Sequence, residues 1–512
     1  MIQILQKLKL STFDAFILCL ILFVSYIIHL LIKYPDCAIG ARHRKDLVGP
    51  KGIPLIGNLI SLIKRKTVVQ YEHELANKYG SNFSFTALGQ GRVIVSNDPR
   101  TVEHVAKTNF DDYPKGEKLY KISYDVFGDG ISTVNGPKWK FQRKMISHLF
   151  QGKNFRNLIY TSVIRKSKAV INILKEHADI EKPIDLKDLF SRFTIDTIGD
   201  ISLGEDFRCL THPDEMSQFV TYLDVIVFGI FGRFENPFWK FTEKYSKKGQ
   251  QMYKAFKYID DYIYNLINKH KSQLEVDRDS VKNLLASFIE AVDDNGKKFN
   301  DKELRDVVIN LILGGRNTTT LALSWTIYSI MINQSVENSL LQEINMILSA
   351  EMPIPSYDDI KKFQYTTAVF YETLRLYPVV PMNGRVAIKD NVLPNNIPVF
   401  AGELVKFNAY SMGRDEKIWG EDAKKFNPKR FLESEDVLKP DQFKFPVFYA
   451  GSRACLGQHL ATIEVVILVV LMLKEFKFEL VPGQKSPPEF KEAMTLQMKD
   501  PLMTKVSYRT KK

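Results

Sequence analysis

One short segment near the carboxyl end restricts the possible folds of this 512-residue chain more than any other feature. It places Cys455 between glycines, two residues after Arg453, and a long apolar run follows. Such a segment can turn sharply, direct backbone N–H groups at the sulfur and start a helix just beyond it, and each effect stabilises a thiolate. A buried structural cysteine is the simpler interpretation of a lone cysteine. The spacing favours instead a thiolate ligand of haem iron, with Arg453 placed to pair with a carboxylate of the ligand.

The same segment resembles the haem-ligand signature of the cytochrome P450 monooxygenases. The matching residues are Phe448, Gly451, Arg453, Cys455, Gly457 and Ala461. The resemblance implies a cytochrome P450 fold, mainly α-helical with small β-sheets and an N-terminal transmembrane helix, that binds haem b (iron protoporphyrin IX). In that family the thiolate pushes electron density onto the iron and favours cleavage of the O–O bond. Ser452 stands where proline is frequent in relatives, and serine can also form the turn.

A second pair of residues points to the same cofactor. Trp139 and Arg143 lie four residues apart, so a helix places them on one face. Alone they would indicate a packing or cation–π pair. On the resemblance they contact a haem propionate, because they follow Gly128-Asp-Gly-Ile-Ser-Thr in the family order. We expect Cys455 to be the metal ligand. The other residues expected to bind the cofactor are Arg453, Trp139, Arg143, Phe448, Gly451 and Gly457. The two glycines allow the backbone to approach a flat macrocycle.

A long helix is predicted to begin at Asn300, which forms a capping-box pattern with Glu303. Gly314 and Gly315 interrupt it, and each costs about 1 kcal/mol relative to alanine. A local widening of the helix beside the oxygen-binding position would explain them and would leave backbone carbonyls for water or Thr318. Close helix packing is the alternative explanation.

The residue before Thr318 departs from the family pattern. Relatives usually carry an acid there, whereas this chain has Asn317, whose amide cannot ionise. The resemblance implies that this threonine takes part in proton delivery. We therefore expect Thr318 and ordered water to deliver protons, with Asn317 orienting that water.

Three charged residues resemble the Glu-Arg-Arg triad of the family core. Glu372 and Arg375 lie one helical turn apart, and Arg430 follows in an irregular segment. A solvated pair at this spacing would contribute only a few tenths of a kcal/mol. Buried charges would instead need mutual pairing. The resemblance implies a role for this structural triad in folding and haem retention.

The amino-terminal run Phe13–Ile32 is long and apolar enough to cross a bilayer, which takes roughly 20 helical residues. A signal peptide would have a shorter apolar stretch and a small-residue cleavage site. We predict an uncleaved single-pass anchor, with a buried core helix as the alternative. More basic residues follow the run than precede it, which weakly places the large domain in the cytosol. These residues are Lys33, Arg42, Arg44, Lys45 and Lys51 after the run and Lys7 and Lys9 before it.

Three regions follow from these features. We expect residues 1–34 to form the membrane anchor and 59–512 the haem-thiolate monooxygenase domain, with 35–58 as a basic and proline-rich hinge that resembles the hinge of microsomal family members. The resemblance implies that the protein lies at the endoplasmic reticulum membrane. The alternating runs Phe83–Gly89 and Arg92–Ser96 predict a β-hairpin. The four cysteines show no paired spacing, so the sequence suggests neither a disulfide framework nor a zinc site.

The net charge of +12 fits an anionic membrane, an acidic protein or nucleic acid as a partner. No nucleic-acid-binding module is visible, so we expect no nucleic acid partner. The basic cluster Lys138, Lys140, Arg143 and Lys144 could dock an acidic electron donor, or could be a solvated face. Nothing in the chain resembles a flavin-binding domain. On the resemblance, the donor is NADPH–cytochrome P450 reductase, with cytochrome b5 as a further partner.

Several short stretches are similar to the clan that contains fatty-acid and alkane terminal hydroxylases of fungi and plants. They are Gly128–Ile131, Arg233–Lys240, Gly315–Thr319 and Leu323–Trp325. An apolar pocket gains about 0.8 kcal/mol per buried methylene, which suits a long chain and also a steroid. We expect one oxygen atom from O2 to enter a C–H bond of a long-chain fatty acid or alkane. A steroid or terpenoid hydroxylase, and a haem sensor or electron carrier that does not oxygenate, remain alternatives. The expected substrate-facing residues are Leu313, Gly314, Val379, Met382 and Leu496, although each could be plain core.

Overall fold

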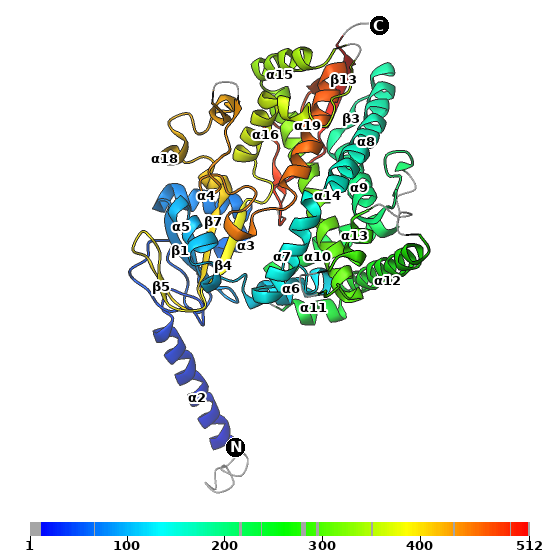
Figure 1. The fold of residues 1–512 in the computed structure, drawn as a ribbon. Coiled ribbons are helices and arrows are strands. Elements are labelled where there is room, and N and C mark those ends of the chain that lie inside the picture. The colour runs from blue at the N-terminus through cyan, green and yellow to red at the C-terminus, as the bar shows by residue number, and fades with distance from the viewer. Residues whose placement is uncertain are drawn as a thin grey trace.

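The computed structural model describes residues 12–65, 67–213, 218–236, 238–277, 283–292, 296–349, 352–433, 436–491 and 493–509. A single helix, α2, projects from a mainly helical body, and the small strands β1, β4 and β7 lie on the side of the body nearest to it (Figure 1). The predicted fold class, mainly α with small β-sheets, is confirmed. Lys7 and Lys9, which entered the prediction of membrane orientation, lie outside the described residues.

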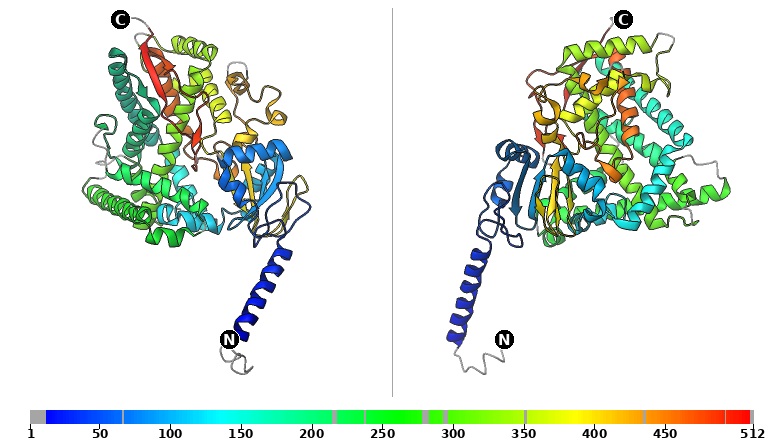
Figure 2. Two further views of the ribbon diagram at one scale, coloured as in Figure 1. Left: turned by 180° about the vertical axis from the view of Figure 1, so that it is seen from behind. Right: turned by 60° about the vertical axis from the view of Figure 1, so that its left-hand side comes forward.

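The projecting helix α2 spans Thr12–Lys33. Its stretch Phe16–Lys33 has a mean hydropathy of 2.5, and none of it is buried against the body. Figure 2 shows from two further directions that α2 extends away from the body. A buried core helix is therefore ruled out for this run. The helix is long and apolar enough to cross a membrane.

The segment that follows α2 is fastened to the body. Arg44 Nη1 donates to Glu403 Oε2 at 2.8 Å, and Arg92 Nη2 donates to the carbonyl oxygen of Arg42 at 2.7 Å. Cys37, in the same segment, is buried. The proline-rich stretch thus follows a fixed, turn-rich path over the sheet.

The largest sheet has the strand order β1-β2-β7-β4. Strands β1 (Asn82–Ala87) and β2 (Gly91–Ser96) form the predicted hairpin, with Phe83 opposite Val95. Strand β7 (Leu404–Asn408) runs parallel to β2, and β4 (Met382–Val386) is antiparallel to β7. This topology brings β7, from late in the chain, beside the amino-terminal hairpin and places β4 at the edge of the sheet, next to β7.

The centre of the body is the 31-residue helix α14 (Asp301–Met331), which begins at the predicted capping box. It packs against α9 (Leu186–Leu203), α12 (Lys247–Val276), α16 (Gln364–Leu376) and α19 (Gln458–Glu475). Helix α19 is apolar and buried on almost every side, as expected for a helix enclosed by others. Helices α14 and α19 therefore form a rigid support for the segments at their ends.

The remaining elements surround this centre. The other helices are α3 (Leu59–Lys64), α4 (Val68–Tyr79), α5 (Pro99–Glu103), α6 (Glu117–Phe127), α7 (Gly136–Gln151), α8 (Lys153–Asp179), α10 (Gln218–Glu235), α11 (Trp239–Tyr245), α13 (Leu284–Glu290), α15 (Gln334–Ile347), α17 (Ala409–Met412) and α18 (Glu416–Trp419). Short 3-10 turns are η2 (Phe110–Asp112), η4 (Ile360–Lys362), η5 (Pro428–Phe431) and η6 (Gly451–Arg453), and η1 (His104–Thr108) is a π-helical turn. A three-stranded sheet has the order β10 (Phe476–Leu480), β13 (Met503–Tyr508), β3 (Ile184–Asp185). The two-stranded pairs are β5 (Asn391–Val392) with β6 (Pro398–Val399), β8 (Leu432–Glu433) with β9 (Asp436–Val437), and β11 (Phe490–Lys491) with β12 (Gln497–Met498).

Candidate functional site

A cavity of about 1540 Å³ lies where α7, α14, β4 and the loop before α19 meet. Its lining includes both Cys455 and Thr318, which are far apart in the sequence. A single small-molecule site usually takes roughly 300–1,000 Å³. The cavity is therefore large enough for a cofactor and a second molecule.

The backbone around Cys455 has the features expected of a thiolate loop. The N–H of Cys455 donates to the carbonyl oxygen of Phe448 at 2.8 Å and closes the turn. The sulfur is exposed to the cavity, yet the surrounding protein desolvates it, and this burial raises the pKa of the thiol. The N–H groups of Gly457 and Gln458, at the start of α19, and the charge of Arg143 oppose that rise. Because burial outweighs them, the pKa of the thiol is raised, and a cation bound at the sulfur would favour the thiolate.

The two glycines of the loop have different functions. Gly457 lines the cavity, and a Cβ atom built on it would lie 3.8 Å from the sulfur of Cys455. Gly451 does not line the cavity, and the structure corrects the prediction that it approaches the macrocycle. It has a φ of +65°, and a Cβ atom there would lie 2.0 Å from the carbonyl oxygen of Ala106. Gly451 is thus required for packing against η1. Phe448 lines the cavity as predicted.

The predicted pair on α7 does face the cavity. Trp139 and Arg143 both line it, and Arg143 Nη1 donates to the carbonyl oxygen of Ala454 at 2.7 Å. The cation–π contact considered as an alternative is also present, but the guanidinium comes from Arg453, 4.5 Å from the centroid of the Trp139 ring. Arg453 Nη2 further donates to the carbonyl oxygen of Val134 at 2.7 Å. These contacts fasten the cysteine loop to α7 and the loop before it.

One cation of the site was missed from the sequence. Arg385, on β4, is buried, lines the cavity and donates from Nε to the hydroxyl of Tyr449 at 2.6 Å. Its Nη1 and the Nε of Arg453 are buried without a hydrogen-bond partner among the described residues. Burial, followed by the charge of Arg385, lowers the pKa of Arg453 to about 9. Arginine in a short strand beside a glycine was the available signal, but only the sheet topology brings it to the cysteine loop.

These arginines fit a ligand that carries carboxylates. Within the described ranges, no ion pair with an acidic side chain is formed by Arg143, Arg385 or Arg453. Buried cations without anions are unfavourable unless a ligand supplies the opposite charge. Haem b would supply it through its two propionates and would place its iron against the sulfur of Cys455. The residues present therefore fit this cofactor.

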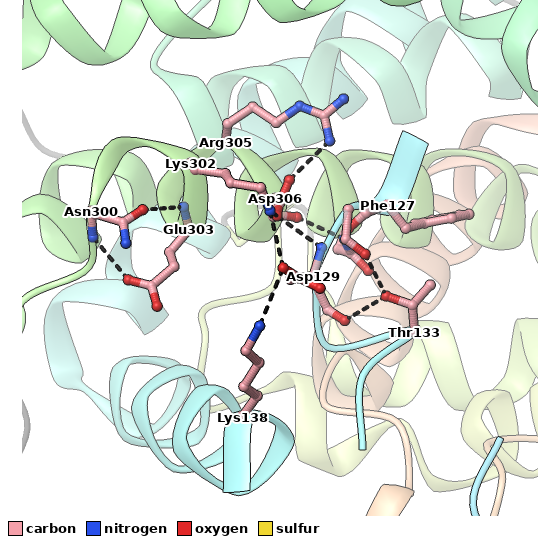
Figure 3. A network of polar contacts seen from close by, with 12 residues as sticks. Phe127, Asp129, Thr133, Lys138, Asn300, Lys302, Glu303, Arg305 and Asp306 are labelled. Carbon is pink, nitrogen blue, oxygen red and sulfur yellow. Dashed lines mark hydrogen bonds and ion pairs between the residues drawn. The ribbon is translucent and has the colours of Figure 1, made fainter. Parts of the chain in front are cut away.

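A polar network fastens the loop 128–135 to α14 (Figure 3). The buried carboxylate of Asp306 accepts hydrogen bonds from the backbone N–H of Asp129 at 2.8 Å, from Lys302 Nζ at 2.9 Å and from Arg305 Nη1 at 3.0 Å. Gly128 has a φ of +51°, and a Cβ atom there would lie 2.1 Å from Asp306 Oδ1. The loop can therefore lie this close to α14 only with glycine at this position.

Asn310, one turn further along α14, secures the same loop. Its Oδ1 accepts from the N–H of Ser132 at 3.1 Å, and its Nδ2 donates to the carbonyl oxygen of Phe127 at 3.0 Å. A Cβ atom on Gly130 would lie 1.9 Å from this Nδ2. The Gly128-Asp-Gly130 motif is thus a docking surface for α14.

The adjacent glycines of α14 face different surroundings. A Cβ atom on Gly315 would lie 2.7 Å from Cδ1 of Ile198 on α9, so this glycine serves close helix packing. A Cβ atom on Gly314 would meet nothing within 4 Å. The hydroxyl of Thr318 donates to the carbonyl oxygen of Gly314 at 2.6 Å, and both residues line the cavity. The predicted widening is not seen, because α14 is α-helical along its entire length.

The two residues beside Thr318 differ from the prediction. Asn317 does not belong to the cavity lining. Thr319 does line the cavity, and its hydroxyl donates to Glu464 Oε2 at 3.1 Å. Burial raises the pKa of Glu464 to about 8, although the hydrogen bond from Thr319 lowers it. The sequence analysis did not single out this buried carboxyl. The signal that could have indicated it is a lone glutamate inside the apolar run of α19.

Four of the five predicted substrate-facing residues line the cavity. They are Leu313, Gly314, Val379 and Met382. The prediction for Leu496 is wrong, because its backbone N–H donates to Val379 at 2.9 Å and its carbonyl oxygen accepts from Trp325 Nε1 at 3.0 Å, which holds it in the core. Ala493 and Met494, from the same segment, line the cavity in its place.

The predicted charge triad is assembled away from the cavity. Glu372 accepts from Arg375 Nε at 2.6 Å and from Arg430 Nε at 3.1 Å. The backbone N–H of Asn427 donates to the same carboxylate at 2.6 Å. Glu372 and Arg375 are completely buried, so each charge depends on the other. The triad joins α16 to η5.

Comparisons with known proteins agree with this arrangement. The sequence model of the cytochrome P450 family matches residues 47–506. Cytochrome P450 monooxygenase cyp1 of Mycosarcoma maydis is 35% identical over 94% of this chain and 78% of its own length. Cytochrome P450 704B1 of Arabidopsis thaliana is 32% identical over 91% of this chain and 96% of its own length, and cytochrome P450 94A1 of Vicia sativa is 31% identical over 84% of each. Since the match runs through the thiolate loop and the glycine-threonine helix facing the same cavity, the chain belongs to the cytochrome P450 family of haem-b monooxygenases.

Proposed function

We propose that this monooxygenase inserts one oxygen atom from O2 into a C–H bond of a long-chain fatty acid or alkane. The observation that carries the proposal is the single cavity shared by Cys455, the cationic cluster and the Gly314–Thr318 face of α14. The resemblance of several stretches to fungal and plant hydroxylases of such substrates supports the choice of substrate.

Haem b supplies oxygen activation and electron transfer when it is bound. Cys455 binds the iron, Gly457 allows close approach, and the carbonyl oxygen of Phe448 closes the turn that presents the sulfur. Trp139, Arg143 and Arg453 hold the carboxylates of the cofactor. Glu372, Arg375 and Arg430 hold α16 and η5 together and so keep the site in shape.

Thr318 positions a proton at the reacting centre. Its hydroxyl donates to the carbonyl oxygen of Gly314, so its oxygen can accept a hydrogen bond from water in the cavity. The neutral acid Glu464 lies behind Thr319, one residue further along. Asn317 lies outside the cavity lining, so its part in orienting water is secondary to that of Thr318.

The substrate is held by apolar contacts. Leu313, Val379 and Met382 line the part of the cavity near α14 and β4, and Trp239 of α11 lines another part. An extended chain gains about 0.8 kcal/mol for each methylene that it buries. A steroid or terpenoid would also gain from such a lining and is the second candidate.

Electrons come from a separate NADPH–cytochrome P450 reductase, with cytochrome b5 as an additional donor. Lys138 and Lys140 of α7 have largely exposed side chains and offer cations to an acidic partner. Arg143 faces the cavity instead and does not belong to this surface. The anchor 1–34 and the hinge 35–58 hold the catalytic domain 59–512 at the cytosolic face of the endoplasmic reticulum.

Two measurements test the proposal. The reduced protein with carbon monoxide should show the absorption of a haem-thiolate, and Cys455→Ser should lose it together with turnover. The holoenzyme with reductase is then supplied with fatty acids, alkanes and steroids, and oxygenated products are identified. Full turnover in Cys455→Ser would refute the iron ligand, and products from steroids alone would refute the substrate class. A carbon monoxide complex without any reductase-dependent product would favour a sensor or electron carrier.

A further inference from the structure

Arg233 connects three helices at one end of the cavity, and the proposed function gives it no role. It lies near the end of α10, is 3% exposed and lines the cavity. Its Nη1 forms an ion pair with Asp125 of α6 at 2.8 Å, and its Nε and Nη2 bind the carboxylate of Glu243 on α11, each at 2.9 Å. The guanidinium also lies 4.2 Å from the centroid of the Trp239 ring, at the start of α11. Figure 1 shows these three helices together on one side of the body.

The last turn of α6 is held by this arginine. Asp125 stands in that turn, where the helix dipole disfavours a negative charge. A carboxylate at such a position is stabilised when a cation faces it, and Arg233 is that cation. Arg233 Nη1 also donates to the carbonyl oxygen of Ile122, on the same helix, at 2.8 Å. These two contacts fix the end of α6 against α10.

The donors of Arg233 are taken up by the protein itself. A buried guanidinium is costly unless its charge is paired and its N–H groups are bonded. Here Nε, Nη1 and Nη2 all donate to protein acceptors, and two carboxylates balance the charge. Arg233 therefore affects a ligand in the cavity through the side chains that it holds in position.

The side chains around Arg233 form part of the cavity wall. The lining includes Ile122 of α6 and Trp239 of α11, together with Phe231 and Phe234 of α10. Aromatic side chains give a wall a definite shape, because they have few rotatable bonds. If α6 and α11 moved apart, this part of the cavity would widen and would no longer exclude wide molecules.

A purely structural explanation is that Arg233 only stabilises the packing of the helices. Helix α10 offers a direct comparison, because a second buried arginine is bound to it. Arg316 of α14 donates to both oxygens of Asp224 on α10, at 2.7 and 3.2 Å. The side chains of Asp224 and Asp125 are 40% and 46% exposed, but neither member of the Arg316 pair belongs to the cavity lining. A role confined to stability would give the two pairs the same effect, whereas a role in shaping the cavity would belong to Arg233 alone.

We propose that Arg233 is a positioning residue that determines which ligands the cavity admits. By holding α6 and Trp239 in place, it fixes the shape of this part of the wall and so favours an unbranched chain over a wide, rigid molecule. The preference for an unbranched chain rests on the proposed function, whereas the positioning of α6 and Trp239 rests only on the contacts of Arg233.

The test uses imidazoles, whose ring nitrogen binds haem iron directly, so that affinity is read from the shift of the haem absorption without any oxygenation. The unbranched probe is 1-dodecylimidazole, and the wide probe is 1-tritylimidazole. Dissociation constants for both are measured with the purified parent holoprotein, Arg233→Met and Asp125→Ala. The matched control is Asp224→Ala, which removes the acid partner of the other buried arginine at α10. Thermal unfolding of each variant measures its stability separately.

We expect the ratio of the two dissociation constants to shift toward the wide probe by about tenfold in Arg233→Met, which is the effect of losing one charge-assisted contact. The shift in Asp125→Ala should be smaller, about threefold, because Arg233 keeps Glu243. Asp224→Ala should lower the Tm and leave the ratio unchanged. If Arg233→Met does not fold, Asp125→Ala decides the question, because residue 125 is exposed and alanine suits a helix.

Two outcomes would overturn the positioning role. They are a ratio that stays at the parent value in every folded variant at positions 233 and 125, and a ratio that changes equally in Asp224→Ala. The second would show that the loss of any charge pair on α10 has this effect. A parent protein that binds 1-tritylimidazole more tightly than 1-dodecylimidazole would instead refute the preference for an unbranched chain. The positioning of the wall and the choice of substrate can therefore fail separately.

Discussion

Replacing Glu464 by glutamine should change how the stability of the protein depends on pH. The carboxyl lies in α19, is buried and has its pKa raised by burial from an ordinary 4.5 to about 8. The folded protein therefore keeps the proton between these two values, whereas the unfolded chain releases it. Release favours unfolding, so the parent protein loses stability as the pH rises from 4.5 to 8, by about 1.4 kcal/mol for each pH unit.

Glutamine has nearly the same shape and can still accept the hydrogen bond from Thr319, but it does not titrate. Between pH 5 and pH 8 the free energy of unfolding of Glu464→Gln should gain about 3 kcal/mol relative to the parent protein. For a chain of this length that corresponds to about 3 °C in the apparent Tm.

The assay is thermal unfolding of the holoprotein at one scan rate, followed by circular dichroism at pH 5, 6, 7 and 8. The matched control is Glu275→Gln, which makes the same substitution at an exposed position of α12. We expect the Tm difference between Glu464→Gln and the parent to increase steadily with pH, and that of Glu275→Gln to stay nearly constant. A difference for Glu464→Gln that does not vary with pH would show that this carboxyl is already ionised in the folded protein.

Three further predictions concern the loop, the triad and the residue before Thr318. Gly130→Ala should lower the free energy of unfolding by about 2 kcal/mol or more and reduce haem content, because the new Cβ atom would lie 1.9 Å from Asn310 Nδ2. The control is Gly136→Ala, where a Cβ atom has open space at a φ of +62°, and its cost in chemical unfolding should be only about 1 kcal/mol. Glu372→Gln should destabilise the protein by about 3–5 kcal/mol, because the completely buried Arg375 loses its anion, whereas Arg430 keeps Asp422 at 2.9 Å. Chemical unfolding and the haem content after purification would show the loss. Asn317→Asp should leave the product formed per NADPH consumed nearly unchanged, because residue 317 lies outside the cavity lining. A clear change in this ratio would show that residue 317 takes part in proton delivery.

Local patterns in the sequence predicted local structure well. The capping box of α14 and the hairpin of β1 and β2 each depend on residues close in sequence. Such features are determined by short-range geometry, which spacing reveals. The surroundings of Cys455 were predictable for the same reason, since its turn and helix start lie within a few residues.

The residues that were missed or misplaced depend on contacts between distant segments. Arg385 reaches the cavity only because β4 pairs with β7, and Lys115 only because its loop meets residues 131–135. Leu496 is taken into the core by Trp325, a residue more than a hundred positions away. None of these contacts leaves a periodic or compositional signal, so a single sequence cannot reveal them.

The loop 128–135 connects the two halves of the site. On one side Asp306 and Asn310 fix it to α14, the helix that carries Gly314 and Thr318. On the other side its carbonyl groups hold Lys115 and Arg453, two cations that line the cavity. A shift of this loop would therefore change the position of the cations relative to α14. We therefore expect the glycines of the loop, which do not line the cavity, to act on the site through the distance they set between the loop backbone and α14.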